Sequence, residues 1–227
     1  MRPRHWLHPP LTPPFLISLL ALLVVAVVLI QMGIFTYAFE KLGLTERQIF
    51  WILLLSILGS FVNIPLKTYT VAETHPGQIV RVWGIPYVIP DFRLVKRTVL
   101  AVNLGGGVIP VLLSLYLLAR LPSLLHPLLG IAFMAFFTHR LARVVQGAGV
   151  LMPAFIPPIL AALVALLLLP ENAPALAYVS GSLGTLIGAD VMNLPKIRRL
   201  GAQVVSIGGA GTFDGIFLTG VIAVLLA

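Results

Sequence analysis

The sequence contains no cysteine. This absence excludes disulfides, iron–sulfur clusters, thiolate zinc sites and cysteine nucleophiles. Charged side chains are also scarce, since Asp, Glu, Lys and Arg make up 10% of the 227 residues, whereas they make up about 25% of a soluble protein. The five histidines share no metal-ligand spacing, and there is no phosphate-loop or dinucleotide fingerprint. We therefore expect no metal and no cofactor, and the missing phosphate loop argues against a pump driven directly by ATP.

Hydrophobic residues make up 59% of the chain, whereas about 45–50% is usual for soluble proteins. A hydrocarbon core about 30 Å thick needs about 20 apolar residues per helix, and seven segments approach or exceed that length. They lie near residues 14–37, 49–66, 99–119, 124–141, 150–169, 175–194 and 204–227. The sequence thus predicts an all-α, polytopic membrane protein of about seven transmembrane helices, which forms a single integral membrane domain, residues 1–227.

Lysine and arginine sort by side of the predicted membrane. Twelve of the 15 fall in the N-terminal segment and in the loops after the second, fourth and sixth helices, whereas Lys41, Arg47 and Arg120 fall in the opposite loops. Cytoplasmic loops carry such an excess, so we expect a cytoplasmic N-terminus and a multi-pass location in the cell (inner) membrane. The first apolar run exceeds the apolar region of a signal peptide, so we expect a retained anchor. The net charge of +8 is explained by these basic residues on the cytoplasmic side of the membrane. The expected partner is therefore the lipid bilayer and not nucleic acid.

One segment between the predicted helices, residues 67–98, is long and polar enough to fold in water. Its β-rich runs are separated by Gly84, Pro86 and the pair Pro90-Asp91, which is typical of short strands joined by turns. We expect a small cytoplasmic β-hairpin insertion here, between helices two and three, with its basic residues against anionic lipid headgroups.

Short strings recur in the two halves of the chain. "LGSFVNIPLK" at 58–67 matches "IGADVMNLPK" at 187–196, and "VNLGGGVIP" at 102–110 matches "VSIGGAGTF" at 205–213. These matches predict a parallel repeat of three helices, residues 14–119 and 150–227, of the kind that some carriers use. Short apolar strings also match by chance, and that alternative stays open.

Two of the seven acidic residues fall inside apolar segments. Asp190 lies in "GTLIGADVMNLP", and Asp214 lies in "GGAGTFDGIFLTG" at the start of the last predicted helix. An ionised, unpaired carboxylate costs several kcal/mol in such a setting. Each has a structural alternative, because Asp190 can accept a loop amide and Asp214 can cap a helix. Since consecutive antiparallel helices carry them at a similar depth, we expect the two carboxyls to converge near the cytoplasmic side and share a proton.

This pair resembles the site of intramembrane aspartyl proteases of the presenilin and signal-peptide-peptidase type. That family carries one Asp late in one helix and a second in a GxGD motif that opens the next helix. Asp190 resembles the first, although Ala189 replaces the family's tyrosine. Residues 209–211 with Asp214 resemble a stretched GxGD motif, with two residues inserted. The family's later Pro-Ala-Leu element has no counterpart after Asp214.

The candidate site combines this pair with polar and glycine residues at the same predicted ends of the helices. The asparagines there are expected either to cap broken helices or to bind a substrate, and the glycine-rich turn is expected to admit water and an unwound substrate strand. The candidate catalytic residues are Asp190 and Asp214, and the candidate substrate-binding residues are Asn193, Gly208, Gly209, Gly211, Thr212, Asn63 and Asn103.

A closer resemblance covers nearly the whole chain. The strings "AVNLGGGVIPVLLSLYLL", "GTLIGADVMNLP" and "GGAGTFDGIFLTG" resemble an uncharacterised family of prokaryotic polytopic membrane proteins, domain of unknown function 1614. This resemblance implies a membrane protein of bacteria or archaea and supplies no activity. Three candidate functions follow from the sequence. The first is an intramembrane aspartyl protease acting on a transmembrane peptide. The second is a proton- or cation-coupled carrier of a small solute, built from the repeat, and the third is a non-catalytic membrane assembly protein.

Overall fold

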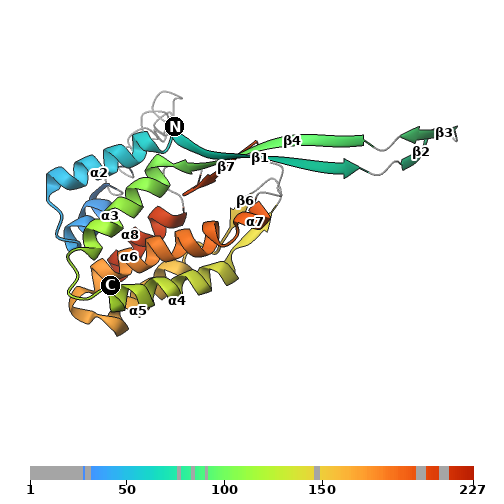
Figure 1. Ribbon diagram of the computed structural model, residues 1–227. Helices are drawn as coiled ribbons and strands as arrows, with labels where there is room; N and C mark the ends of the chain where they lie inside the picture. Colours follow the sequence, from blue (N-terminus) through green and yellow to red (C-terminus); the bar gives the residue numbers. More distant parts are fainter. Residues whose placement is uncertain are drawn as a thin grey trace, which may run out of the picture. The chain divides into compact units, whose positions relative to one another are not determined.

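A computed structural model describes residues 28, 32–75, 78–82, 85–89, 92–145, 149–197, 203–209 and 215–227, with side chains described outside residues 71–96. The chain divides into two units, Met1–Tyr37 and Ala38–Ala227. In the first unit, the described residues 28 and 32–37 are helical. All further elements belong to the second unit (Figure 1).

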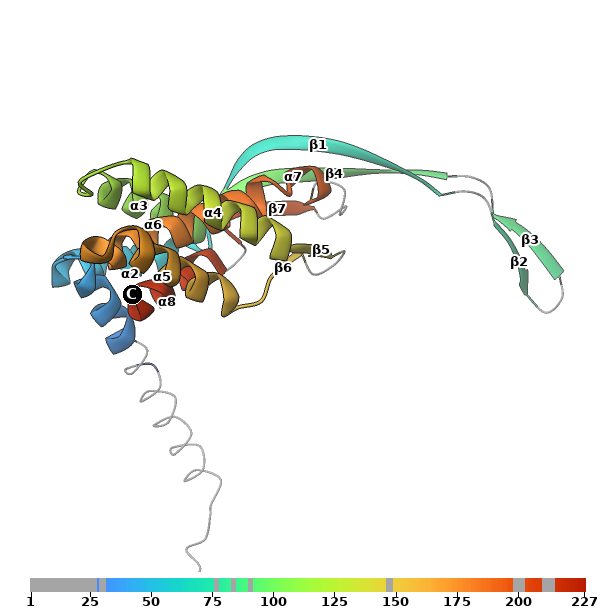
Figure 2. The ribbon, with the colours of Figure 1, turned by 90° about the horizontal axis from the view of Figure 1, so that it is seen from below.

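The second unit contains a bundle of short helices with α6 at its centre. Its α-helices are α2 (Glu46–Gly59), α3 (Ile109–Leu118), α4 (Leu125–Leu141), α5 (Ile156–Leu168), α6 (Ala173–Thr185), α7 (Leu194–Ile197) and α8 (Gly215–Leu226). This unit also contains two π-helical turns, η1 (Leu104–Val108) and η3 (Leu186–Val191), one 3₁₀ turn, η2 (Pro170–Asn172), and the helical residues 38–41. Helix α6 packs against α3, α4, α5 and α8 (Figures 1 and 2).

Small side chains allow the helices of the bundle to approach closely. Ala161 and Ala165 of α5, Ala177 of α6 and Ala223 of α8 are fully buried in one apolar cluster. Gly184 also has no room for a side chain, because a Cβ there would overlap Met134 of α4. Small residues at such contacts are typical of helices that pack by close van der Waals contact.

Several helices are shorter than the apolar segments in which they lie. Helix α4 coincides with the predicted segment 124–141 to within one residue. The segment 49–66 instead contains α2 followed by a strand that begins at Asn63, and the segment 204–227 contains a strand followed by α8. Short apolar runs suit a buried strand as well as a helix. None of the helices in the described ranges combines the length and the apolar character that crossing a membrane requires.

The strands form three sheets. Strands β1 (Asn63–His75) and β4 (Phe92–Asn103) pair antiparallel along their whole length, from Asn63 opposite Asn103 to His75 opposite Phe92 (Figure 2). Strand β7 (Val204–Ile207) pairs in parallel with the inner end of β4, with Val102 opposite Ile207. Two hairpins complete the set, β2 (Gln78–Val82) with β3 (Ile85–Ile89), and β5 (Arg143–Val145) with β6 (Gly149–Leu151). The segment 67–98, expected as a β-hairpin, lies within the longer stretch from β1 to β4.

The helices alternate in direction, so the bundle has two distinct ends. We call the end where α2 and α4 finish and α3, α5 and α8 begin the ribbon end, because the two-stranded ribbon of β1 and β4 joins the bundle there: β1 begins at this end and β4 ends at it (Figure 1). At the opposite end, Lys41 Nζ donates to the last carbonyls of α8, those of Val224 at 3.2 Å and Leu225 at 3.5 Å. A cation there favours the helix, because the C-terminal carbonyls carry partial negative charge.

Candidate functional site

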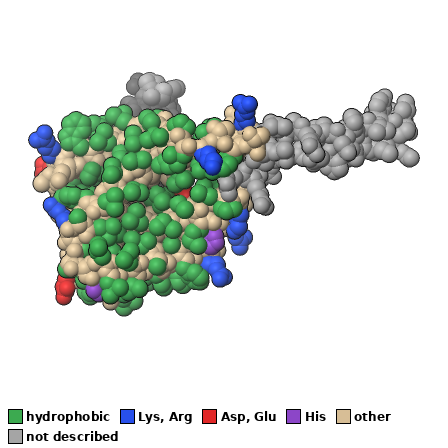
Figure 3. Space-filling view, viewed as in Figure 1, with side chains coloured by type: hydrophobic (Ala, Val, Ile, Leu, Met, Phe, Trp, Pro, Cys, Tyr) green, Lys and Arg blue, Asp and Glu red, His purple; other side chains and the backbone are tan. Residues whose placement is uncertain are grey.

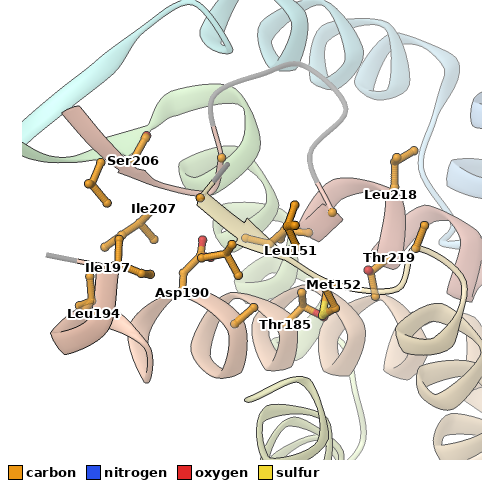
Figure 4. A pocket seen from close by; sticks show the side chains of 18 of the residues that line it. Leu151, Met152, Thr185, Asp190, Leu194, Ile197, Ser206, Ile207, Leu218 and Thr219 are labelled. Atoms are coloured by element: carbon orange, nitrogen blue, oxygen red, sulfur yellow. The ribbon is translucent and has the colours of Figure 1, made fainter. Parts of the chain in front are cut away.

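A cavity of about 780 Å³ opens at the ribbon end of the bundle (Figure 4). Its walls come from η3 and α7, from the first turns of α8, and from the strands β6 and β7. Most of the lining is apolar, with Leu151, Leu194 and Ile207 among its side chains. The polar side chains on the described lining are Thr185, Asp190, Ser206 and Thr219. The cavity is therefore a mostly apolar pocket with few hydrogen-bonding groups, an arrangement typical of a binding site.

Asp190 is the ionisable side chain on the described lining of this cavity. It lies in η3 and is partly exposed. Its Oδ2 accepts a hydrogen bond from the backbone N–H of Gly208 at 2.8 Å. A backbone N–H donor stabilises the ionised form of a carboxylate, and this bond fixes the carboxyl group against the turn that follows β7.

The π-helical turn that carries Asp190 is held by α4. The hydroxyl of Thr138 donates to the carbonyl of Gly184 at 3.1 Å, and Nδ1 of His139 lies 3.3 Å from the carbonyl oxygen of Gly188. A Cβ at Gly188 would overlap Thr138 and the backbone of Ala135. The two glycines thus bring η3 against the end of α4, and this contact positions the next residues of the turn, including Asp190.

Gly208 meets Asp190 because its backbone takes a conformation that favours glycine. Its φ is +84° and that of Gly209 is +74°, a left-handed region that other L-residues enter at a cost of about 1–2 kcal/mol. A Cβ at Gly208 would also lie 2.5 Å from both the N and the Cα of Gly107. The glycine-rich turn after β7 therefore crosses the glycine-rich turn η1 backbone to backbone, and no side chain fits between them.

The three candidate asparagines lie outside the described cavity lining, and two of them, Asn103 and Asn193, bind backbone groups. Asn103 is fully buried; its amide donates to the carbonyl of Ser60 at 2.8 Å, and its Oδ1 accepts the N–H of Gly106 at 2.8 Å. Asn193 is also fully buried and donates to the carbonyls of Gly188 and Ala189, both at 3.1 Å. Both asparagines thus bind backbone groups at the ends of helical turns, as expected of residues that cap broken helices. That any of them binds a substrate stays a prediction.

Asn63 lies at the junction of the three strands β1, β4 and β7. Its Oδ1 accepts a hydrogen bond from Nδ2 of Asn103 at 3.2 Å and one from the hydroxyl of Ser206 at 2.6 Å. Ser206 also lines the cavity. Asn63 therefore supports one wall of the cavity from behind.

Gly211, Thr212 and Asp214 lie outside the described residues. The residues that flank this segment, Gly209 and Gly215, both line the cavity. The convergence of Asp190 with Asp214 stays a prediction.

Several lining residues have no counterpart among the predicted site residues. Strand β6 contributes Gly149, Val150 and Leu151, and α6 and α8 contribute Thr185 and Thr219. Threonine in an apolar helix is common, so its presence alone gave no signal. As for metal ligands, no three His, Asp or Glu side chains come together in the described part of the chain.

Comparisons with known proteins identify the family of the chain but give no activity for it. No curated protein and no solved structure matches it. One family profile matches residues 57–226, which include β6, η3, α7, β7 and α8, the elements that form the walls of the cavity. The chain therefore belongs to the family described as protein of unknown function (DUF1614).

Proposed function

We propose that the protein is embedded in the cell membrane. The first support is the apolar outer surface of the bundle. Leu167 of α5 is 82% exposed, and Leu112 of α3, Leu128 of α4 and Trp51 of α2 are each about half exposed or more. Hydrophobic side chains cover the face of the bundle that Figure 3 presents. Soluble monomers rarely expose contiguous apolar patches larger than a few hundred Å².

The second support is the distribution of charge. At the ribbon end, the described charged residues on the surface are basic: Lys67, Arg97, Arg140, Arg143 and Lys196. At the opposite end, acidic and basic residues are mixed: Glu40, Lys41, Glu46, Arg47, Arg120 and Glu171. Charged side chains lie at both ends in Figure 3, with the apolar face between them. An excess of Lys and Arg is typical of the cytoplasmic side, so the ribbon end faces the cytoplasm in this proposal.

The size of the bundle agrees with this location. Helix α4 has 17 residues, which at about 1.5 Å per residue corresponds to about 26 Å. The hydrocarbon core is about 30 Å thick. In the proposal, the extended segments and glycine turns at the ribbon end complete the crossing, and they are covered by protein or by the water-filled cavity, as irregular backbone in a membrane must be.

Within this membrane protein we propose an aspartyl protease, with Asp190 and Asp214 as its two catalytic carboxyls. One observation carries the proposal. Asp190 lines a cavity, and Gly209 and Gly215, the described residues on either side of Asp214 in the sequence, line that same cavity. Two carboxyls in one apolar site share a proton, because both cannot be ionised at short distance.

The chemistry of such a pair needs no other group. The ionised carboxylate takes a proton from water, and the water oxygen bonds to the carbon of the peptide carbonyl. The second carboxyl gives its proton to the carbonyl oxygen. The tetrahedral intermediate then collapses: the second carboxylate takes back a proton from one hydroxyl of the intermediate, the C–N bond breaks, and the amine leaves with the proton held by the first carboxyl.

The walls of the cavity favour a peptide as the substrate. All four residues of β7 line the cavity, and β4 is the strand that pairs with β7 in the described sheet. The other edge of β7 therefore offers backbone N–H and C=O groups toward the cavity. An extended peptide can bind to such an edge by main-chain hydrogen bonds, and the apolar lining suits the side chains of a transmembrane segment.

A carrier is the second candidate. It is favoured by the parallel pairing of β4 with β7, since each strand runs into one of the two matching strings, at 102–110 and 205–213, that begin the third helix of each predicted copy of the repeat. In that case Asp190 takes a proton or cation, and the cavity is part of a path. If Asp190 has only a structural role, its hydrogen bond to the N–H of Gly208 is all that the role requires.

The deciding experiment places cysteines at both candidate positions of this cysteine-free chain. Asp190→Cys with Asp214→Cys is oxidised in membranes, and a short bifunctional maleimide is used in parallel, because a disulfide requires Cβ atoms about 3.5–4.5 Å apart. Asp190→Cys with Glu171→Cys, which lies at the opposite end of the bundle, is the control. An internal crosslink in the first pair only supports the protease. Absence of a crosslink with both reagents in folded protein overturns it.

A matching activity assay uses the full chain in liposomes with synthetic transmembrane peptides, and mass spectrometry detects the cleavage products. Asp190→Asn and Asp214→Asn should each abolish cleavage without unfolding the protein, whereas Glu171→Gln should retain it. Cleavage that survives either aspartate substitution contradicts the proposed pair. Proton-coupled solute flux that tolerates Asp214→Asn favours the carrier.

A further inference from the structure

Thr185 presents an unpaired hydroxyl to the cavity. Its side chain is 1% exposed, and its Oγ1 has no hydrogen-bond partner among the described residues. It lines the cavity together with Asp190. Of the buried side-chain polar atoms that lack a partner in the described chain, Thr185 Oγ1 is the one on the cavity lining. A buried hydroxyl without a partner is unfavourable, so this one calls for an explanation.

Other buried hydroxyls nearby do have partners. Ser180, on the same helix, donates to the carbonyl of Leu176 at 2.7 Å, and Thr138 on α4 donates to the carbonyl of Met134 at 2.7 Å. Both side chains are fully buried. Each follows the usual pattern, in which a Ser or Thr in a helix donates to the carbonyl one turn earlier. Thr185 does not follow it, although its helix offers the same kind of acceptor.

The π-helical turn places Thr185 and Asp190 on the same side of the chain. In an α-helix each residue turns by about 100°, so two residues five positions apart point about 140° away from each other. Thr185 directly precedes η3, and Asp190 lies within it. A π-helix closes its turn between residues i and i+5, so the side chains of Thr185 and Asp190 point to the same cavity, as Figure 4 shows.

We propose that Thr185 is a substrate-binding residue whose hydroxyl donates a hydrogen bond to a main-chain carbonyl of a peptide bound beside Asp190. The inference rests on the proposed peptide substrate and deepens it. The ligand supplies the acceptor that the free protein lacks, and it does so next to the carboxyl that acts on the peptide bond. A fully apolar transmembrane segment also carries such carbonyls, which become free once its helix unwinds.

The first test measures stability and needs no ligand. Thr185→Val keeps the shape of the side chain and removes the hydroxyl, so it should leave the Tm of the purified full chain unchanged or raise it. Thr138→Val is the matched control, and it should lower the Tm, because it removes hydrogen bonds to Met134 and Gly184. A Tm for Thr185→Val that falls as far as that of Thr138→Val overturns the inference, whatever the activity of the protein.

The second test measures binding with a defined probe, an apolar peptide that contains a hydroxyethylene group in place of one peptide bond. Thr185→Val should weaken its binding by about tenfold, the loss expected for one hydrogen bond, and Thr185→Ser should restore it. A series of probes in which each main-chain carbonyl is replaced in turn by a methylene should contain one member whose binding no longer depends on Thr185.

The outcomes separate this inference from the proposed function. Equal affinity of wild type and Thr185→Val, with binding lost in Asp190→Asn, overturns the role of Thr185 and leaves the protease in place. No binding to the wild type overturns both.

Discussion

The hydroxyl of Ser206 donates a hydrogen bond of 2.6 Å to the side-chain oxygen of Asn63, which lies 143 positions earlier in the chain. Asn63 opens β1 and Ser206 lies in β7, so the bond connects the two outer strands of the sheet across β4. One side of β7 faces the cavity, and this hydrogen bond helps to hold the strand there.

We expect the two side chains to be energetically coupled. Asn63→Ala and Ser206→Ala should each destabilise the protein, and the double variant should lose less than the sum, by about 0.5–1.5 kcal/mol. Reversible unfolding of the purified chain in mixed micelles measures the coupling. Ser206→Ala combined with Glu171→Ala, at the opposite end of the bundle, should be additive. If the losses of stability in Asn63→Ala and Ser206→Ala simply add in the double variant, the bond contributes nothing to stability.

Gly208 should tolerate no side chain. Gly208→Ala combines a positive φ with a Cβ that overlaps the backbone of Gly107, so we expect a loss of about 2–5 kcal/mol. Gly149 gives the control, since its φ is +82° but nothing lies within 4 Å of a Cβ there. Gly149→Ala should lose only about 1–2 kcal/mol. Equal losses in thermal unfolding would show that the crossing of the two glycine turns does not matter.

Lys41 should stabilise the end of α8. Its Nζ donates to the carbonyls of Val224 and Leu225, and Lys41→Met should cost about 0.5–2 kcal/mol. Arg47→Met removes the same charge from an exposed position in the first turn of α2, where a cation opposes the helix dipole, so it should be neutral or slightly stabilising. The comparison is made by thermal unfolding at low salt, and a reversed order would contradict the capping role of Lys41.

The two ends of the bundle should be accessible from opposite sides of the membrane. Single-cysteine variants Arg143→Cys, at the ribbon end, and Glu171→Cys, at the other end, both replace exposed residues. In intact spheroplasts a membrane-impermeant maleimide should label Glu171→Cys at once and Arg143→Cys only after lysis. Equal labelling of both variants in intact spheroplasts would contradict the proposed orientation.

Two residues that the sequence analysis named as site candidates are in contact in the structure. Asp190 and Gly208 were both expected in the site, and they are joined by a hydrogen bond. Asp190 was identified because a carboxylate in an apolar segment is costly, a signal that needs no knowledge of the fold. The bond to Gly208 is of the kind that the structural alternative described, in which Asp190 accepts a loop amide, although the sequence did not identify Gly208 as the donor.

The architecture depends on interactions between distant residues, which local patterns do not contain. Residues 204–207 form a strand because β4 lies beside them, and their apolar character alone suits a helix equally well. Thr185 was missed for a different reason. Helical periodicity assigns it and Asp190 to different faces, and only the π-helical turn η3 brings them to one cavity.

The parallel pairing of β4 with β7 also has a consequence for biosynthesis. Val99 and Val204 are partners across these strands, and a ribosome that adds about 5–20 residues per second needs roughly 5–20 s to reach the second after the first. During that interval the edge of β4 that β7 later covers has no strand to pair with. An open edge of this kind invites pairing with another chain, so the nascent protein needs protection at β4 until residues 204–207 are made. The cavity beside β7 is completed later still, when the first turns of α8 follow.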